Sequence, residues 1–169
     1  PTRRQVYVEH FQNATRALKP LKTLQYDAKP GDSYQYSSSG YNVLAAVLET
    51  IYEKPIQSVL EEQVTRPLGI QNTGYLDVMA AIDNLGRNYS YVDIWDYTES
   101  SKLQLVPTWD FSYNFGVGNM YSTADDLLTL GHAIITSDWV GPEQYDLVTS
   151  ALEPEVSNWS AGWIVSEGG

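Results

Sequence analysis

An extended segment gives way to a helix within one short stretch of the chain, Pro30-Gly31-Asp32-Ser33-Tyr34-Gln35-Tyr36-Ser37-Ser38-Ser39-Gly40-Tyr41. Pro30-Gly31 is a turn signal, and the two tyrosines that follow alternate with Gln35 as in an extended segment. Three serines then precede an apolar run. A serine there favours a helix start, because its hydroxyl can accept a backbone N–H of the first turn. The stretch therefore predicts that Tyr36 stands at the entrance to a helix, where a phenol can point into a cleft.

Apolar periodicity predicts helices on both sides of this stretch. Residues 1–26 carry a weak helical pattern that Pro20 interrupts, which indicates two short helices. From Ser39 to Tyr52 the spacing of apolar residues predicts a buried helix. Its apolar face would consist of Tyr41, Leu44, Ala45, Leu48, Ile51 and Tyr52.

A second helix should begin near Pro55 and end before Pro67, because proline suits a first helical turn and restricts the residue before it. Its apolar stripe would be Ile56, Val59, Leu60 and Val64. The turn that follows should place Leu68 and Ile70 in the core.

The second half of the chain reads as loops and short strands, then helices. Strands are predicted at Tyr89–Val92 and from Leu103 to Val106, joined by a polar turn at residues 98–101. Aromatic residues are frequent between Asp93 and Phe115, and they fit a cleft lining or a plain core equally well.

Ser122-Thr123-Ala124-Asp125 is typical of a capping box, with Ser122 as the cap. The apolar run after it predicts a buried helix in which His132 is packed. Another helix should run from Pro142 to Leu152, and a strand should begin at Trp163.

Several of these segments occur together, and in the same order, in a known protein family. They are the stretch quoted above, then Pro67-Leu68-Gly69-Ile70 with Thr73, then Tyr121-Ser122-Thr123-Ala124-Asp125-Asp126-Leu127, then Ala161-Gly162-Trp163. Taken together, they resemble the serine β-lactamase and penicillin-binding-protein family. The branches most similar are the class C-like esterases and peptidases and the mitochondrial β-lactamase-like protein. The resemblance covers most of the chain from about Asn13 onward.

The resemblance implies an α/β (α+β) fold of the β-lactamase/transpeptidase type. This chain would supply mostly the helical part, with a few short strands, and the central sheet of the family would be largely missing. Residues 1–169 are accordingly expected to form a single partial domain, the central segment of a β-lactamase-like serine hydrolase. The glycine-rich segment at residues 115–119 lacks the lysine of a phosphate-binding loop, and the resemblance implies instead a close backbone approach before a helix.

The nucleophile motif of the family is absent. That nucleophile lies in a Ser-x-x-Lys motif, and no lysine here has a serine three residues before it. The residues at that offset are Arg16, Lys19, Tyr26, Ile51 and Glu99. Neither Lys-Thr-Gly nor His-x-Gly occurs. In the family the nucleophile precedes the part seen here and the basic triplet follows it, so the acylated serine and its lysine are expected from outside this chain.

Tyr36 and Ser38 are the candidate site residues. Tyr36 matches the tyrosine of the family's Tyr-x-Asn motif, which implies a general base beside the Ser-x-x-Lys lysine. Ser38 stands where the family usually has asparagine, and its hydroxyl can still donate a hydrogen bond to substrate, although it reaches less far than an amide. The alternative from turn chemistry alone is that Tyr36 is a packing aromatic and the serines are caps.

Two functions therefore stay open. The first is a β-lactamase-related serine hydrolase that transfers acyl groups of esters, peptides or amides through a serine acyl-enzyme. The second is a catalytically inactive homologue that serves as a structural or interaction subunit. No cofactor and no metal ion are expected, since His10 has no second ligand at helical spacing. The partners expected are a small ester or peptide-like substrate and the segments, or a second chain, that carry the missing motifs.

Composition sets further bounds. The net charge is −11, and the residues from Leu103 onward include nine acidic side chains and no lysine or arginine. Such a surface repels phosphate backbones, so nucleic-acid binding is not expected. The acidic half is either a solvated surface or one neutralised by cations in the missing parts. No apolar run is long enough to span a membrane. The chain has no cysteine, which does not fix the compartment: extracytoplasmic, periplasmic and mitochondrial locations all remain open.

Overall fold

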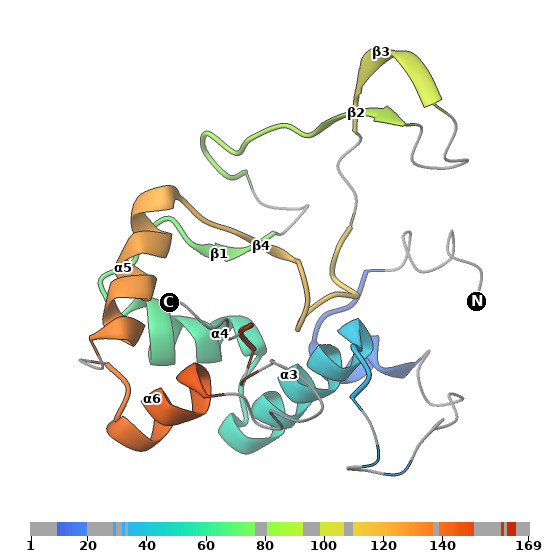
Figure 1. Cartoon of the computed structure of the whole chain (residues 1–169). Helices are drawn as coiled ribbons and strands as arrows, with labels where there is room; N and C mark the ends of the chain where they lie inside the picture. Colours follow the sequence, from blue (N-terminus) through green and yellow to red (C-terminus); the bar gives the residue numbers. More distant parts are fainter. Residues whose placement is uncertain are drawn as a thin grey trace.

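Helices dominate the computed structural model, which describes residues 10–19, 29, 32, 34–76, 81–92, 99–106, 110–136, 139–150, 160 and 162–164 (Figure 1). The helical elements are α2 (Ala14–Ala17), α3 (Ser38–Tyr52), α4 (Ile56–Leu60), the π-helix η2 (Glu61–Thr65), α5 (Ala124–Ile135) and α6 (Pro142–Thr149). The strands are β1 (Gly74–Tyr75), β2 (Tyr89–Val92), β3 (Glu99–Leu105) and β4 (Met120–Tyr121). The prediction of a mostly helical chain with a few short strands is confirmed.

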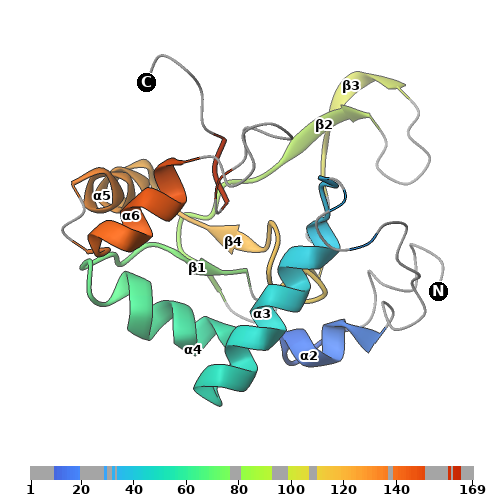
Figure 2. The same ribbon diagram turned by 60° about the horizontal axis from the view of Figure 1, so that its bottom comes forward.

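Within the described residues the strands form two separate antiparallel pairs. β1 pairs with β4, and Gly74 lies opposite Tyr121. β2 pairs with β3 in a hairpin with an irregular register, in which Tyr89 lies opposite Leu105. The β1–β4 ladder lies between α5 and α3, whereas the hairpin lies apart from the helices (Figure 2).

A buried glutamate in α3 joins three helices. The Glu49 carboxylate accepts the backbone N–H groups of Ala14 and Thr15 at 3.1 and 3.2 Å and that of Ile56 at 3.1 Å. These donors belong to the first turns of α2 and α4, whose amides have no partner within their own helices. Pro55, which precedes α4, offers no side-chain cap, so Glu49 takes that role. One carboxylate therefore fixes α2 and α4 against α3.

Small side chains fill the space where these helices meet. The hydrophobic core consists of Phe11, Ala14, Ala17, Ala45, Ala46, Ile56, Val59 and Phe115. Four of its eight members are alanines, which allow helix backbones to approach closely. Figure 2 shows α2 and α4 beside α3, as the contacts between them require.

The loop before β4 is fastened to the first half of α3. Asn42 donates from its amide nitrogen to the Tyr113 carbonyl at 2.9 Å, and its oxygen accepts the Gly116 N–H at 2.8 Å. A methyl group on Gly116 would overlap the Tyr41 carbonyl and lie 2.7 Å from Asn42 N. The close backbone approach expected at residues 115–119 is thus confirmed, and it occurs against α3.

The predicted capping box at α5 is shifted by one residue. The cap is Thr123, not Ser122, and its hydroxyl accepts the Asp126 N–H at 3.2 Å. Asp126 in turn accepts from Asn72 N at 2.7 Å and from Thr73 Oγ1 at 2.9 Å. The acidic residue of this turn therefore ties α5 to the loop before β1 instead of closing a capping box on its own helix.

The apolar faces predicted to be buried are largely exposed. On α3 the buried residues are Asn42, Ala45, Ala46 and Glu49, whereas Leu44, Leu48 and Ile51 are 56, 38 and 67% exposed. On α5, Leu127, Leu128 and Ile135 are exposed, and His132 is exposed instead of packed. Periodicity located these helices correctly. On α3 it predicted the burial of Ala45 correctly, but the other residues of the predicted face are exposed, because small and polar residues make the contacts of this helix.

Other boundaries differ in detail. The second helix changes to π geometry after Leu60, with Arg66 N bonding to the Glu61 carbonyl, and this wider turn buries Thr65 where Val64 was expected. Ile70 is buried as predicted, and Leu68 is half-buried. Of the polar turn expected at residues 98–101, residues 99–101 belong to β3.

At the C-terminal end, α6 begins at Pro142 as predicted and ends at Thr149, while Ile164 makes a single β-bridge beside the expected strand start. Pro30-Gly31, Pro20 and most of residues 1–26, along with Leu152 and residues 93–98, lie outside the described residues.

Replacing Glu49 with alanine is expected to lower the free energy of unfolding by about 3–5 kcal/mol, because buried N–H groups that lose their acceptor cost about 1–3 kcal/mol each. Urea unfolding followed by circular dichroism would measure it. Glu61→Gln is the matched control, since it breaks only the exposed ion pair with Arg66 and should cost under about 1 kcal/mol. Equal losses in the two variants would contradict the role of Glu49.

Gly116→Ala is expected to destabilise the protein by more than about 2 kcal/mol, because the added methyl group would overlap the backbone of α3. Gly131 provides the control. It lies inside α5 with open space around it, so Gly131→Ala should stabilise the helix by about 0.5–1 kcal/mol. Thermal unfolding of both variants tests the pair, and similar effects of the two substitutions would refute the close approach at Gly116.

Candidate functional site

Tyr36 lies at the entrance to α3, as the sequence predicts. The helix begins at Ser38, and its cap is Ser37, whose side chain accepts the Gly40 N–H at 3.0 Å. Ser37 keeps an extended backbone, with φ −140° and ψ 105°, so the chain before it points away from the helix axis. The Tyr36 side chain is 63% exposed.

An open cleft of about 390 Å³ surrounds this point. The residues that line it are Tyr34, Gln35, Tyr36, Ser37, Gly40, Tyr41, Leu44 and Ser160. Tyr36 therefore presents a phenol to a cleft, which is the geometry that a substrate-facing acid or base requires.

Ser38 occupies the first position of α3 and is exposed. It lies two residues from Tyr36 in sequence but is not among the residues that line the cleft. The capping role that the alternative interpretation gave to Ser38 or Ser39 belongs to Ser37. The structure thus places both candidate residues at one helix start, with only Tyr36 facing the cleft.

Ser160 is a cleft residue that sequence reasoning missed. It is buried, its hydroxyl donates to the Val148 carbonyl at 2.8 Å, and its N–H donates to the Trp163 carbonyl at 2.8 Å. Gly162, with φ +97°, completes this tight turn. The only signal was the adjacent Ala161-Gly162-Trp163 segment. With its hydroxyl engaged by a carbonyl, Ser160 serves as a wall of the cleft and not as a nucleophile.

The phenols of the cleft influence one another. Desolvation, and then the neighbouring hydroxyls of Tyr41 and Tyr36, raise the pKa of Tyr34 above the ordinary value of 10.0. Like charges disfavour each other's ionisation, so Tyr34 is not expected to be ionised beside another phenolate. The described residues that line the cleft include no lysine or arginine. These lining residues therefore supply no cation to the cleft.

Tyr75, unlike the tyrosines of the cleft, has a phenol that packs against the core. It is half-buried against the core and donates its hydroxyl hydrogen to the Phe115 carbonyl at 2.7 Å. Burial, reinforced by the nearby Glu49 carboxylate, raises the pKa of Tyr75 to about 12. This tyrosine stays neutral at physiological pH and serves as a structural donor.

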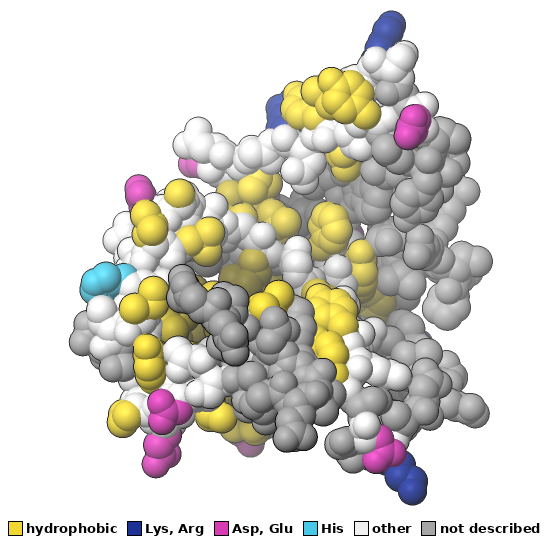
Figure 3. All heavy atoms as spheres, viewed as in Figure 1, with side chains coloured by type: hydrophobic (Ala, Val, Ile, Leu, Met, Phe, Trp, Pro, Cys, Tyr) yellow, Lys and Arg dark blue, Asp and Glu magenta, His cyan; other side chains and the backbone are white. Residues whose placement is uncertain are grey.

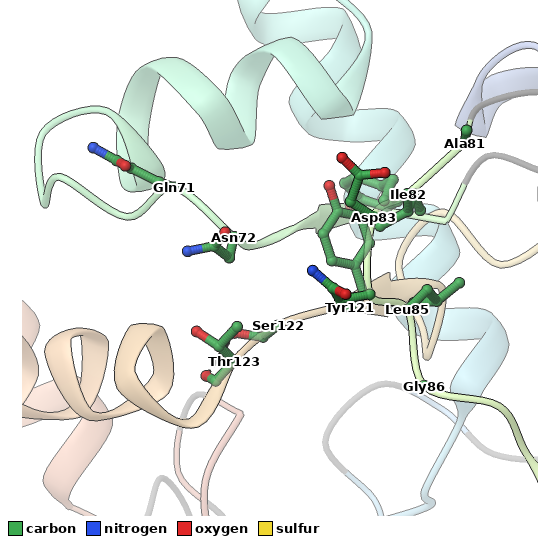
Figure 4. A pocket seen from close by; sticks show the side chains of 12 residues that line it. Gln71, Asn72, Ala81, Ile82, Asp83, Leu85, Gly86, Tyr121, Ser122 and Thr123 are labelled. Atoms are coloured by element: carbon green, nitrogen blue, oxygen red, sulfur yellow. Dashed lines mark hydrogen bonds between the residues drawn. The ribbon is translucent and has the colours of Figure 1, made fainter.

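A second cavity, of about 510 Å³, lies between the loop before β1, residues 81–86 and the start of α5 (Figure 4). Figure 4 shows Asp83 and Tyr121 among the residues that line one side of it, with Ser122 and Thr123 at another. Neither Tyr36 nor Ser38 lines this cavity, so it is separate from the cleft that Tyr34, Tyr36 and Tyr41 line.

His10 has a carboxylate partner 100 residues away. Its Nδ1 lies 2.7 Å from Asp110 Oδ2, and Ser112 N donates to Asp110 Oδ1 at 2.7 Å. Burial works to raise the pKa of Asp110, but hydrogen bonds from Ser112 and His10 outweigh it and lower that pKa.

This group is no catalytic triad, because the Ser112 hydroxyl is buried and accepts the Phe11 N–H at 2.7 Å. It joins the segment before α2 to the loop before β4. Among the described residues no cluster of histidine and carboxylate side chains could hold a metal ion.

Comparison with known families gives a match over nearly the whole chain. The profile of the family described as Beta-lactamase matches residues 3–169. The mouse serine β-lactamase-like protein LACTB, mitochondrial, is 27% identical over 156 residues, which cover 87% of this chain and 26% of that protein. The Escherichia coli K12 D-alanyl-D-alanine-carboxypeptidase/endopeptidase AmpH is 40% identical over 57 residues, or 34% of this chain and 15% of that protein. The chain thus spans about a quarter or less of these relatives.

The fold agrees with this match. The crystal structure of FmtA from Staphylococcus aureus superimposes with a TM-score of 0.76 at 22% sequence identity, covering 92% of this chain and 43% of that one. The helices and short strands described above therefore form part of the β-lactamase/transpeptidase-like α/β fold. On the family profile, which matches residues 3–169, and this fold together, the chain belongs to the Beta-lactamase family.

Proposed function

We propose that this chain is the central segment of a serine hydrolase that transfers acyl groups of esters, peptides or amides through an acylated serine. Tyr36 acts as the general base in this proposal, and Ser38 donates a hydrogen bond on the substrate side. The observation that carries it is the exposed Tyr36 phenol in a cleft at the start of α3. Relatives named as a carboxypeptidase/endopeptidase, AmpH, and as a teichoic acid D-alanine hydrolase support the reaction class.

The nucleophile and the cation belong to the polypeptide that completes the domain. Acyl transfer requires a nucleophile, a base within hydrogen-bond reach and a group that stabilises the oxyanion. The sequence holds no Ser-x-x-Lys, and the described residues that line the cleft include no lysine or arginine. A lysine beside Tyr36 would favour its ionisation or exchange a proton with it.

The second candidate function is a catalytically inactive homologue that serves as a structural or interaction subunit. The observation that favours it is serine in place of asparagine at position 38, together with its place outside the cleft lining. The two candidates differ in one feature of the complete protein. An enzyme retains Ser-x-x-Lys before this segment and Lys-Thr-Gly or His-x-Gly after it, whereas an inactive homologue lacks them.

Tyr36→Phe in the complete protein is expected to slow acylation by an activated ester roughly 10²–10⁴-fold, the range for a positioned acid–base group. Pre-steady-state release of nitrophenol would measure the acylation rate. Stability should change little, because the ring remains and the residue is 63% exposed. Tyr34→Phe, in the same cleft, is the matched control and should retain most of the rate. Near-native acylation by Tyr36→Phe would remove Tyr36 from the mechanism.

The 169-residue chain on its own is expected to be inactive. It should not hydrolyse a nitrophenyl ester above background, and a fluorophosphonate or β-lactam probe should form no acyl-enzyme with it, because the serine–lysine pair is missing. Intact-protein mass spectrometry after incubation with the probe would report a covalent adduct. Stoichiometric labelling of one serine in this chain would overturn the assignment of the nucleophile to another segment.

A further inference from the structure

Three asparagines of this chain begin an Asn-x-Ser or Asn-x-Thr sequence, the acceptor pattern for N-linked glycans. The three sequences are Asn13-Ala14-Thr15, Asn88-Tyr89-Ser90 and Asn158-Trp159-Ser160. The pattern alone does not distinguish them, because it specifies only an amide and the hydroxyl two residues later. The structure distinguishes them by what these groups already bind.

The first of these sequences is part of the junction between α2 and α3. Asn13 caps α2, and its Oδ1 accepts the Arg16 N–H at 2.9 Å. Ala14 is fully buried. Thr15 donates its N–H and its hydroxyl to Glu49 Oε2 at 3.2 and 3.4 Å. Once the helices form, the amide and the hydroxyl of this sequence are both engaged, and its backbone is helical instead of accessible to an enzyme.

The hydroxyl of the third sequence is enclosed. Asn158 lies outside the described residues, but Ser160, which supplies the hydroxyl, is 6% exposed and donates to the Val148 carbonyl at 2.8 Å. An acceptor sequence is recognised through this hydroxyl as well as through the asparagine. In the folded chain the third sequence therefore cannot offer its hydroxyl to an enzyme.

The second sequence is the accessible one. Asn88 is exposed and stands directly before β2, in the hairpin that lies apart from the helices (Figure 1). Its carbonyl accepts the Val106 N–H at 2.8 Å, which continues the ladder between β2 and β3 by one residue. A two-stranded hairpin is marginally stable by itself. This segment can therefore open for an enzyme after the helices have folded.

Strand geometry places Asn88 on the polar face of the hairpin. Ser90 lies opposite Gln104, and Tyr89 lies opposite Leu105. Residues that pair across an antiparallel ladder share a face, and successive residues of a strand point to opposite faces. Asn88 and Ser90 are therefore on the same face, where the amide and the hydroxyl of the acceptor sequence are presented together. A glycan on this face leaves the apolar face with Tyr89 and Leu105 uncovered.

We propose that Asn88 is the N-glycosylation site of this chain, in preference to Asn13 and Asn158. The donor is a lipid-linked oligosaccharide pyrophosphate, used by the oligosaccharyltransferase of a secretory compartment. The Asn88 amide nitrogen forms a bond to C1 of the sugar and loses one proton, while the bond between C1 and the pyrophosphate oxygen breaks and the lipid pyrophosphate leaves. The product is a bulky, solubilising group on the surface of the hairpin.

This modification belongs to an extracytoplasmic location, one of those that the sequence leaves open. It is independent of the proposed function, because Asn88 does not line the cleft at Tyr36.

Site occupancy can be measured in eukaryotic secretory cells that express the complete protein behind a cleavable signal peptide. The secreted and intracellular pools would both be analysed, because glycan transfer precedes export. Peptide N-glycosidase F in water enriched in heavy oxygen converts each glycosylated asparagine to labelled aspartate, which peptide mass spectrometry counts site by site. A sample without the glycosidase corrects for spontaneous deamidation. Occupancy is expected to be at least about fivefold higher at Asn88 than at Asn13 or Asn158.

Ser90→Ala and Ser90→Thr are a matched pair at the hydroxyl position. Ser90→Ala is expected to abolish the label at Asn88, whereas Ser90→Thr keeps the hydroxyl, suits a strand and should keep the label. Asn88→Gln should lose the same glycan. Absence of a glycan at Asn88 in the unsubstituted protein, or higher occupancy at Asn13 or Asn158, would overturn the proposal. Undiminished labelling of Asn88 in Ser90→Ala would also overturn it.

Discussion

The arrangement of the helices depends on one buried carboxylate. Glu49 is 9% exposed, and placing a charge there is costly unless hydrogen bonds compensate for the lost water. Three backbone N–H groups at two helix starts provide that compensation, and the positive ends of two helix dipoles add to it. The same contacts satisfy amides that α2 and α4 cannot satisfy themselves. The Glu49 carboxylate and these backbone N–H groups would all be unsatisfied if the helices moved apart. The hydrogen bonds therefore hold α3 in a fixed position relative to α2 and α4.

The start of α3 is also fixed by contacts with the loop before β4. Asn42 binds two backbone groups of the loop before β4, and Gly116 brings that loop against the Tyr41 carbonyl. Tyr75 adds a hydrogen bond from β1 to the same loop. These contacts converge within one turn of the helix entrance at which Tyr36 lies. A side chain exposed to a cleft can keep a defined position when the backbone that carries it is held in this way.

The two sides of α3 differ in the size and polarity of their side chains. One side carries small and polar residues that make all of the described core contacts, while the other presents large apolar residues to the surface. Figure 3 shows that hydrophobic side chains also gather over α5 and over the β2–β3 hairpin, where Leu127, Leu128, Tyr89 and Leu105 are exposed. Exposed apolar surface of this extent is typical of an interaction site. The large exposed apolar surface is consistent with the coverage of the FmtA structure, of which this chain matches 43%.

The sequence by itself determined the local elements, the family and the position of Tyr36. Serines before an apolar run located the start of α3, and prolines located α4 and α6, because caps and proline act within a few residues. Tertiary structure alone decided which side of α3 is buried, since alanines and Glu49 pack there through partners 35 residues away. It also moved the α5 cap from Ser122 to Thr123, because Asp126 binds the loop at Asn72 and Thr73. Ser160 lines the cleft through contacts between segments that are distant in sequence. Such contacts leave no periodic or local pattern in the sequence, so the sequence did not predict this position.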